Sequence, residues 1–253
     1  MSILFEFPLN ERIRLLLRVE AVFKRWNHYQ SQLDSGSHYT ALLALFEFLD
    51  LATSRSDMKS EVLQEMERQR AAVLGFRGHA SSDNQAVDAL LAEIETVFKA
   101  LQNNTQRVAQ NLREDEWLMT INTRCNVPGG TCSFDLPSYH AWLHLPDETR
   151  QADLIRWFEP AAALQNAVAL VLRLLRDSYP AKAIIAVKGA YQLDTRNKTY
   201  QLARLWLPAD VRAVPEISAS KYGVWIRLLQ QATQTKTPQV LADVPIRLAM
   251  CML

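Results

Sequence analysis

The sequence predicts an α+β protein, in which an N-terminal all-helical domain is followed by a small antiparallel β-sheet domain. Apolar residues recur every three or four positions through most of the first 178 residues, which is the spacing of one face of a helix. From Pro180 they recur at every second position, as in strands with one buried face. Only seven glycines in 253 residues argue against a large α/β enzyme with glycine-rich ligand loops. We therefore expect a helical domain over 1–178 and a strand domain over 179–253.

The helical part divides into segments with recognisable start signals. The first begins after Asn10, an N-cap residue, and carries an apolar stripe from Leu15 to Trp26. Asp57 and Asp83 are expected to cap the third and fourth helices. The remaining helices are expected over 39–49, 112–121, 138–145, from 147 and from 160 to 175. The last of these is apolar around much of its girth, which predicts a central position.

Residues 127–146 are the stretch least typical of ordinary helices. Pro128-Gly129-Gly130 predicts a tight turn, because proline fixes φ and glycine permits a positive φ. Pro137 suits the first turn of a short helix, which Pro146 ends. A turn followed by a short aromatic helix predicts a corner where separate elements pack together.

This corner has two interpretations. Four side chains have the chemistry of zinc ligands, and they are Cys125, Cys132, His140 and His144. The histidines share a helical face, but the cysteines are seven positions apart and no acid separates the histidines as in H-E-x-x-H. We therefore predict no metal and no cofactor. The alternative is a packed corner in which the apolar side chains are buried: Phe134, Leu136, Tyr139, Trp142, Leu143 and Leu145.

The second domain contains four strand candidates, over 182–187, 200–207, 221–228 and 240–252. In two of them a tryptophan shares a face with basic residues. Arg204 alternates with Trp206, and Lys221 and Arg227 alternate with Trp225. One interpretation is a binding face with cation–π support, and the other is a half-exposed sheet shielded by long basic side chains. We also expect Arg204 to lie on a strand next to that of Lys221 and Arg227.

Charge is distributed unevenly along the chain. Residues 179–253 hold ten basic and four acidic side chains, a net charge of +6, whereas residues 1–178 carry −5. The whole chain is close to neutral at +1. A basic second domain predicts an acidic partner.

Other classes of protein are disfavoured by what the chain lacks. It contains no phosphate-binding glycine loop, no G-x-S-x-G sequence, and no third group to orient a Cys132–His140 nucleophile pair, so we expect no enzyme. The N-terminal residues do not have the basic region followed by an apolar run that is typical of a signal peptide. The sequence also has no run of about 18 apolar residues, so we expect no membrane span. Three cysteines fit a reducing compartment, and we expect the cytoplasm.

Several segments of the sequence resemble the ZapD family of cell-division proteins. They are L-F-E-F-P-L-N-E-R at 4–12, L-R-V-E at 17–20, L-R-E-D at 112–115, P-E-I-S-A-S-K at 215–221 and, above all, the block at 128–146. The resemblance runs nearly from end to end. One departure is Tyr222-Gly223, where a more polar and basic stretch would follow the lysine in the family.

The resemblance implies a cytoplasmic homodimer that is recruited to the midcell division ring. There it would bind the C-terminal tail of the tubulin-like protein FtsZ and cross-link FtsZ filaments into bundles, without cofactor or catalysis. Dimerisation would fall to the helical domain and tail binding to the β domain. The positions that carry over as binding residues are Arg18, Arg113, His140, Lys221 and Arg227, and the strand pattern adds Arg204.

The alternative function is nucleic-acid binding through the basic β face, since aromatic side chains beside cations suit stacked bases. The net charge of +1 and the acidic first domain disfavour it. We therefore expect neither a nucleic acid nor a membrane as partner.

Overall fold

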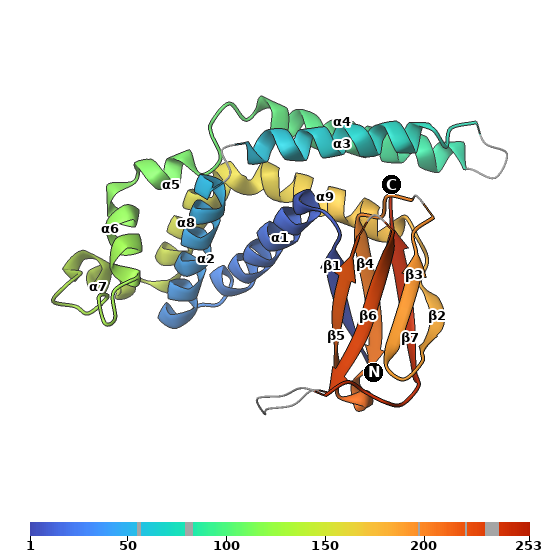
Figure 1. Cartoon of the computed structure of the whole chain (residues 1–253). Coiled ribbons are helices and arrows are strands. Elements are labelled where there is room, and N and C mark those ends of the chain that lie inside the picture. Colours follow the sequence, from blue (N-terminus) through green and yellow to red (C-terminus); the bar gives the residue numbers. More distant parts are fainter. Residues whose placement is uncertain (55–56, 79–82, 197, 221, 231–237) are drawn as a thin grey trace. The chain divides into compact units, whose positions relative to one another are not determined.

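The computed structural model of the protein describes residues 1–54, 57–78, 83–196, 198–220, 222–230 and 238–253. It consists of two compact units, one helical and one built mainly from strands (Figure 1). The predicted α+β class, with helices first and an antiparallel sheet structure after them, is confirmed. The helical unit is Arg18–Val171, and the β unit joins Met1–Leu17 to Leu172–Leu253. This division differs from the expected 1–178 and 179–253, because the first residues of the chain belong with the last.

The helices lie close to the predicted segments. Their bounds are α1 Glu11–Gln30, α2 Ser35–Ser54, α3 Met58–Leu74, α4 Asn84–Asn103, α5 Gln110–Glu114, α6 Glu116–Cys125, α7 Pro137–Leu143, α8 Asp147–Phe158 and α9 Ala162–Asp177, with a 3-10 turn, η1, at Glu159–Ala161. Helices α1 and α9 each contribute residues to both units. Helices α3 and α4 lie side by side, linked by an ion pair between Arg70 and Glu95 at 3.8 Å (Figure 1).

The predicted caps are confirmed in two of three places. Asn10 accepts a hydrogen bond from the backbone N–H of Ile13, with Oδ1 2.8 Å from N. Asp83 accepts from the N–H groups at the start of α4. Asp57 precedes α3, but its side chain makes no capping hydrogen bond. The single helix expected from 112 to 121 is two helices, because Asp115 caps Leu118 and starts α6 afresh.

Aromatic rings hold α1, α2 and α8 together in the helical unit. Trp26 stacks on Phe158 with ring centroids 3.7 Å apart, and Phe23 meets the same phenylalanine edge-on at 5.3 Å. Phe23 also touches Phe48 of α2 at 5.0 Å. All four rings are buried, so this cluster is part of the apolar core of the unit.

The corner predicted from residues 127–146 is a tryptophan cluster. Trp117 of α6 stacks on Trp157 of α8 at 5.5 Å, and Trp142 of α7 touches both, at 5.8 and 6.0 Å. Leu136, Tyr139 and Trp142 are buried as predicted. The prediction was wrong for two others, because Phe134 is 80% exposed and Leu145 40% exposed. Leu143 is half-buried.

Arg150 stabilises the connection between α7 and α8. Its guanidinium is buried and donates hydrogen bonds to the carbonyl oxygens of Leu143 and Leu145 and to the carboxylate of Asp147. Nε donates to Nδ1 of the buried His38 at 3.1 Å. These bonds satisfy carbonyls at the end of α7 that have no partner within the helix.

The helical stretch Asp147–Asp177, which contains α8 and α9, is long and strongly apolar over part of its length. By length and composition alone it could cross a membrane, but 56% of its most apolar window is buried within the structure. The core helix of a globular protein has the same composition, and α9 is buried along Leu164, Val168 and Leu175. Burial therefore accounts for its apolar character.

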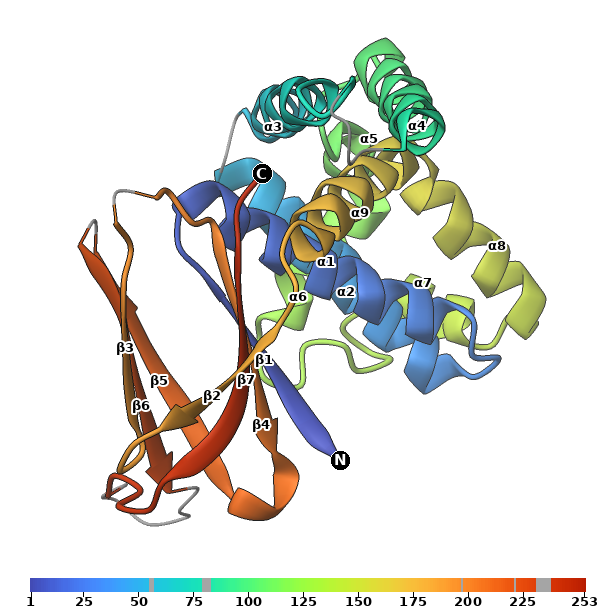
Figure 2. The same cartoon turned by 90° about the vertical axis from the view of Figure 1, so that its right-hand side faces the viewer.

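The β unit is a sandwich of two antiparallel sheets. Its strands are β1 Ser2–Pro8, β2 Lys182–Ala186, β3 Ala190–Asp194, β4 Leu202–Pro208, β5 Ala213–Ala219, β6 Gly223–Gln230 and β7 Val244–Cys251, with a 3-10 turn, η2, at Ala209–Val211. The order is β1-β4-β7-β2 in one sheet and β3-β6-β5 in the other. Figure 2 shows the two sheets facing one another. Sequence analysis found β2, β4, β6 and β7 but missed β1, β3 and β5.

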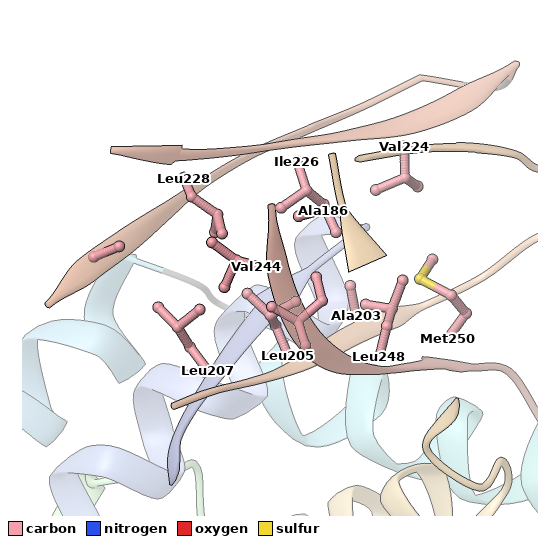
Figure 3. Close-up of a cluster of buried hydrophobic side chains, with 12 residues drawn as sticks. Ala186, Ala203, Leu205, Leu207, Val224, Ile226, Leu228, Val244, Leu248 and Met250 are labelled. Atoms are coloured by element: carbon pink, nitrogen blue, oxygen red, sulfur yellow. The ribbon is translucent and has the colours of Figure 1, made fainter. Parts of the chain in front are cut away.

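The inner faces of the two sheets share one apolar core. The four-stranded sheet contributes Leu205 and Leu207 from β4 and Ile246 and Leu248 from β7. The three-stranded sheet contributes the alternate residues of β6, which are Val224, Ile226 and Leu228 (Figure 3). Because side chains alternate along a strand, the residues between them on β6 point to the outer face.

Candidate functional site

The outer face of the three-stranded sheet carries the tryptophan and arginine that the sequence singled out. Trp225 and Arg227 on β6 are both exposed, and they alternate with the buried Val224, Ile226 and Leu228. The prediction that these two side chains share an exposed face is confirmed. Lys221, which the same pattern places on this face, lies outside the described residues.

Arg227 is held by a carboxylate from the neighbouring strand. It lies directly opposite Glu216 of β5 in the antiparallel register. Its Nη2 and Nε both donate to Oε2 of Glu216, at 2.6 and 3.0 Å. The side chains are 60% and 52% exposed, so solvent screens the pair.

A shallow depression of about 700 Å³ surrounds these side chains. Across β6, Trp225 lies between Gln192 of β3 and Ser218 of β5 in the register of the sheet. The indole is accessible between them, at 37% exposure. The full lining is Ala190, Tyr191, Gln192, Glu216, Ile217, Ser218, Trp225, Ile226 and Arg227. The surface thus offers an aromatic ring beside a guanidinium.

A second hollow, of about 430 Å³, borders the end of the same strand β5. Its polar side chains include Lys198, Thr199 and Ser220, the last of which directly precedes Lys221. Ser218 lines the first depression and Ala219 the second. Strand β5 therefore runs from one hollow to the other.

Arg204 does not belong to this surface, and the expectation that it lies on a neighbouring strand is wrong. It lies on β4, in the four-stranded sheet. Its Nε donates to Oε1 of Glu6 at 2.9 Å, and Glu6 also takes two hydrogen bonds from Arg176. Its guanidinium lies 4.9 Å from the ring of Trp206, which it shares a face with as predicted. Arg204 is only 17% exposed, so its charge is used inside the β unit.

Arg18 lines a groove between α1 and α2 on the helical unit. The groove has a volume of about 490 Å³ and an apolar floor that includes Val22 and Leu51. Arg25 bridges it by a paired contact with Glu47, whose two oxygens lie 2.7 and 2.8 Å from Nη1 and Nη2. Arg18 is exposed at its edge.

Arg113 of α5 lies beside the C-terminal end of α2. Its Nη2 donates to Oγ1 of Thr53 at 2.9 Å, and it lines a pocket of about 290 Å³ with Lys59 and Arg107. The neighbouring Ser54 lines the groove that contains Arg18. Arg18 and Arg113 therefore border adjacent hollows at one end of α2.

His140 lies elsewhere, on the exposed surface of the short helix α7. Its ring is 4.5 Å from that of His144, and the described residues provide no group of three or more metal-ligating side chains around them. Cys125 lies 3.9 Å from the hydroxyl of Tyr39, and burial raises the pKa of its thiol. Cys132 is exposed.

A model of the ZapD family of cell division proteins matches residues 17–227. The chain belongs to the ZapD family. The matched region runs from α1 to β6 and contains all six residues singled out in the sequence. It leaves out β1 and β7, although both strands belong to the four-stranded sheet of this ZapD protein. The family consists of cell division proteins, which agrees with the resemblance found in the sequence.

Two parts of this ZapD surface were missed by sequence reasoning. Glu216 was counted only as one of four acids, and β3 was not predicted at all. The alternation of Glu216 and Ser218 with the half-buried Ile217 is the signal that would have placed them on one face.

Proposed function

We propose that this ZapD-family protein binds the C-terminal tail of FtsZ on the outer face of the three-stranded sheet. We further propose that it cross-links FtsZ filaments into bundles in the cytoplasm, at the midcell division ring. The observation that carries the proposal is the depression around Trp225 and Arg227 in the part of the chain that holds the positive charge. Membership of a cell division family supports the choice of partner.

The chemistry of the depression suits an acidic peptide with an apolar side chain. Arg227 can form charge-assisted hydrogen bonds to a carboxylate, and the exposed indole of Trp225 can cover an apolar group beside it. Each exposed charge contact contributes about 1 kcal/mol or less and is screened by salt. Binding through this face is therefore moderate for one site and salt-dependent.

Bundling requires two tail sites in one particle. A homodimer supplies them, since a self-complementary interface places the same surface twice in one assembly. Two linked sites also raise the overall strength of attachment without any new contact, because the second binding event becomes intramolecular. The helical unit is the proposed place of dimerisation.

Arg18, Arg113 and His140 are the alternative tail-binding residues. Arg18 and Arg113 border adjacent hollows, but a bound carboxylate there would meet the C-terminal end of α2, which carries partial negative charge. The depression around Trp225 and Arg227 is lined by strand residues alone, so no helix C-terminus faces a carboxylate there, and we therefore favour it.

Co-sedimentation tests the proposal directly. Purified protein is mixed with GTP-assembled FtsZ polymers, or with polymers of FtsZ that lacks its tail, and the pellets are compared at two salt concentrations. We expect the protein to pellet with full-length polymers, less so at higher salt, and not with the tail-less polymers. Equal pelleting with both polymers would overturn the proposed tail site.

A further inference from the structure

The contact between Arg227 and Glu216 has the same chemistry that an acidic ligand would offer. Both donors of the arginine, Nε and Nη2, reach a single oxygen, Oε2. An arginine fork binds a carboxylate best when two parallel hydrogen bonds reach two oxygens. An incoming carboxylate can therefore match or improve on the contact that Glu216 provides.

The position of Glu216 brings it into competition with any such ligand. Among the nine residues that line the depression, all of them described, Glu216 is the one acidic side chain. On the other side of Arg227 the register places Ala190, which offers no polar group. The internal carboxylate thus occupies the polar flank of the arginine.

We propose that Glu216 closes the acidic-peptide site by holding Arg227, and that binding of the FtsZ tail displaces it. This inference rests on the function proposed above. Glu216 then sets the affinity of the site, because only molecules in which the ion pair is open present a free guanidinium. It also selects for ligands that deliver a carboxylate, since an uncharged peptide does not replace the lost contact.

The strength of the contact keeps the site usable. An exposed cross-strand ion pair is weak. The free energy needed to open it therefore lowers the affinity for the peptide by about two- to fivefold and does not abolish binding. A purely structural pair would behave differently: its loss would leave tail binding unchanged or weaken it, and would lower stability slightly.

A double-mutant cycle tests the inference with a fluorescently labelled synthetic peptide of the FtsZ tail. Anisotropy titrations compare wild type, Glu216→Gln, Arg227→Gln and the double variant. Asp210→Asn is the matched control, because it makes the same charge change on the exposed turn η2 of the same unit. Circular dichroism confirms that each variant is folded.

We expect Glu216→Gln to bind the peptide about two- to fivefold more tightly than either the wild type or the Asp210→Asn control. We expect Arg227→Gln to bind more weakly, and the gain from Glu216→Gln to vanish in the Arg227→Gln background. If the gain persists in that background, Glu216 acts only by repelling the acidic peptide, and the closing contact is refuted. Absence of any gain over Asp210→Asn refutes it as well.

The same titrations separate the two proposals. If Arg227→Gln weakens binding while Glu216→Gln changes nothing, the tail site stands and the role of Glu216 is wrong. If Arg227→Gln binds the peptide as tightly as wild type, the outer face of the three-stranded sheet is not the tail site, and both proposals are overturned.

Discussion

Glu6 on β1 and Arg204 on β4 lie opposite one another in the four-stranded sheet and are joined by a hydrogen bond of 2.9 Å between Oε1 and Nε. The two residues are 198 positions apart in the sequence. Arg176 of α9 binds both oxygens of the same carboxylate, at 2.9 and 2.7 Å. One acid on the first strand therefore ties together β4 and the end of α9 within the β unit.

Loss of this carboxylate is expected to destabilise the β unit. Glu6 is 18% exposed, and each arginine is 17% exposed, so removal of the acid leaves two poorly solvated cations close together. We predict that Glu6→Gln lowers the free energy of unfolding by about 1–3 kcal/mol, as measured by urea denaturation. The control is Glu11→Gln, since the Glu11–Arg14 pair is 69% and 37% exposed and its loss costs less than about 1 kcal/mol. Equal effects of the two substitutions would show that the contact on Glu6 is not structural.

Trp142 and Phe134 provide a second comparison, because they are close in sequence but differ in burial. Trp142 is 6% exposed, contacts both Trp117 and Trp157, and donates a hydrogen bond to Asp153, with Nε1 3.0 Å from Oδ2. We predict that Trp142→Ala costs about 3–5 kcal/mol of stability, whereas Phe134→Ser changes it by less than about 0.5 kcal/mol. Thermal or urea unfolding measures both. A large loss for Phe134→Ser would mean that its ring is covered in solution.

The contrast between these two aromatics illustrates what a sequence reveals. Trp142 falls on the helical spacing of α7 and was predicted to be buried. Phe134 precedes that helix, in a segment of successive turns whose hydrogen bonds include Asp135 N to Cys132 O at 3.0 Å. Helical spacing does not apply to a turn, so hydrophobicity alone wrongly suggested burial.

Distance along the chain explains the remaining misses. The start of α4 is decided by Asp83 and the two N–H groups just after it, so local sequence predicts it. Strand β1 is decided by its register with β4, which no local pattern contains. For the same reason the alternation along β6 predicted that Trp225 and Arg227 share a face, but not that Arg204 lies in the other sheet. Pairing with Glu216 required β5, which was not recognised.

A third prediction concerns the dependence of stability on pH. His38 is fully buried, and its pKa is lowered, first by burial and then by the positive charge of Arg150, against the opposing effects of Asp147 and Asp34. Its Nδ1 accepts a hydrogen bond from Arg150, which requires the ring to lack a proton there. Because the unfolded chain binds the proton more readily, this group favours the folded state above the ordinary histidine pKa of about 6.5.

Stability from His38 is therefore lost as the pH falls below that value towards the lowered pKa of the folded state. We predict that His38→Gln flattens this part of the pH profile of the urea midpoint between pH 7.5 and 5. Exposed His28 supplies the matched control, since His28→Gln should leave the profile as in wild type. A profile unchanged by His38→Gln would show that other groups cause any loss of stability in acid.

The oligomeric state is a fourth prediction. Cross-linking two filaments needs two tail sites, and we predict a homodimer by light scattering at micromolar concentration. Full-length variants with altered charges on the β face should remain dimers, because the proposed dimer interface and the proposed tail site lie in different units. A monomer at these concentrations would contradict cross-linking as the mechanism.

The last prediction tests the basic face itself. Lys221 and Arg227 are six residues apart, so their side chains point to the same side if the strand pattern extends to Lys221. We predict that Lys221→Glu combined with Arg227→Glu abolishes FtsZ bundling, as measured by light scattering and electron microscopy, and leaves the circular dichroism spectrum unchanged. The reversal places like charges opposite Glu216 and repels an acidic tail, so the loss should exceed that of simple neutralisation. Arg14→Glu serves as the control, because Arg14 already pairs with Glu11 at 3.1 Å. If the double variant bundles FtsZ as well as wild type does, the tail lies elsewhere, and Arg18, Arg113 and His140 become the residues to reverse next.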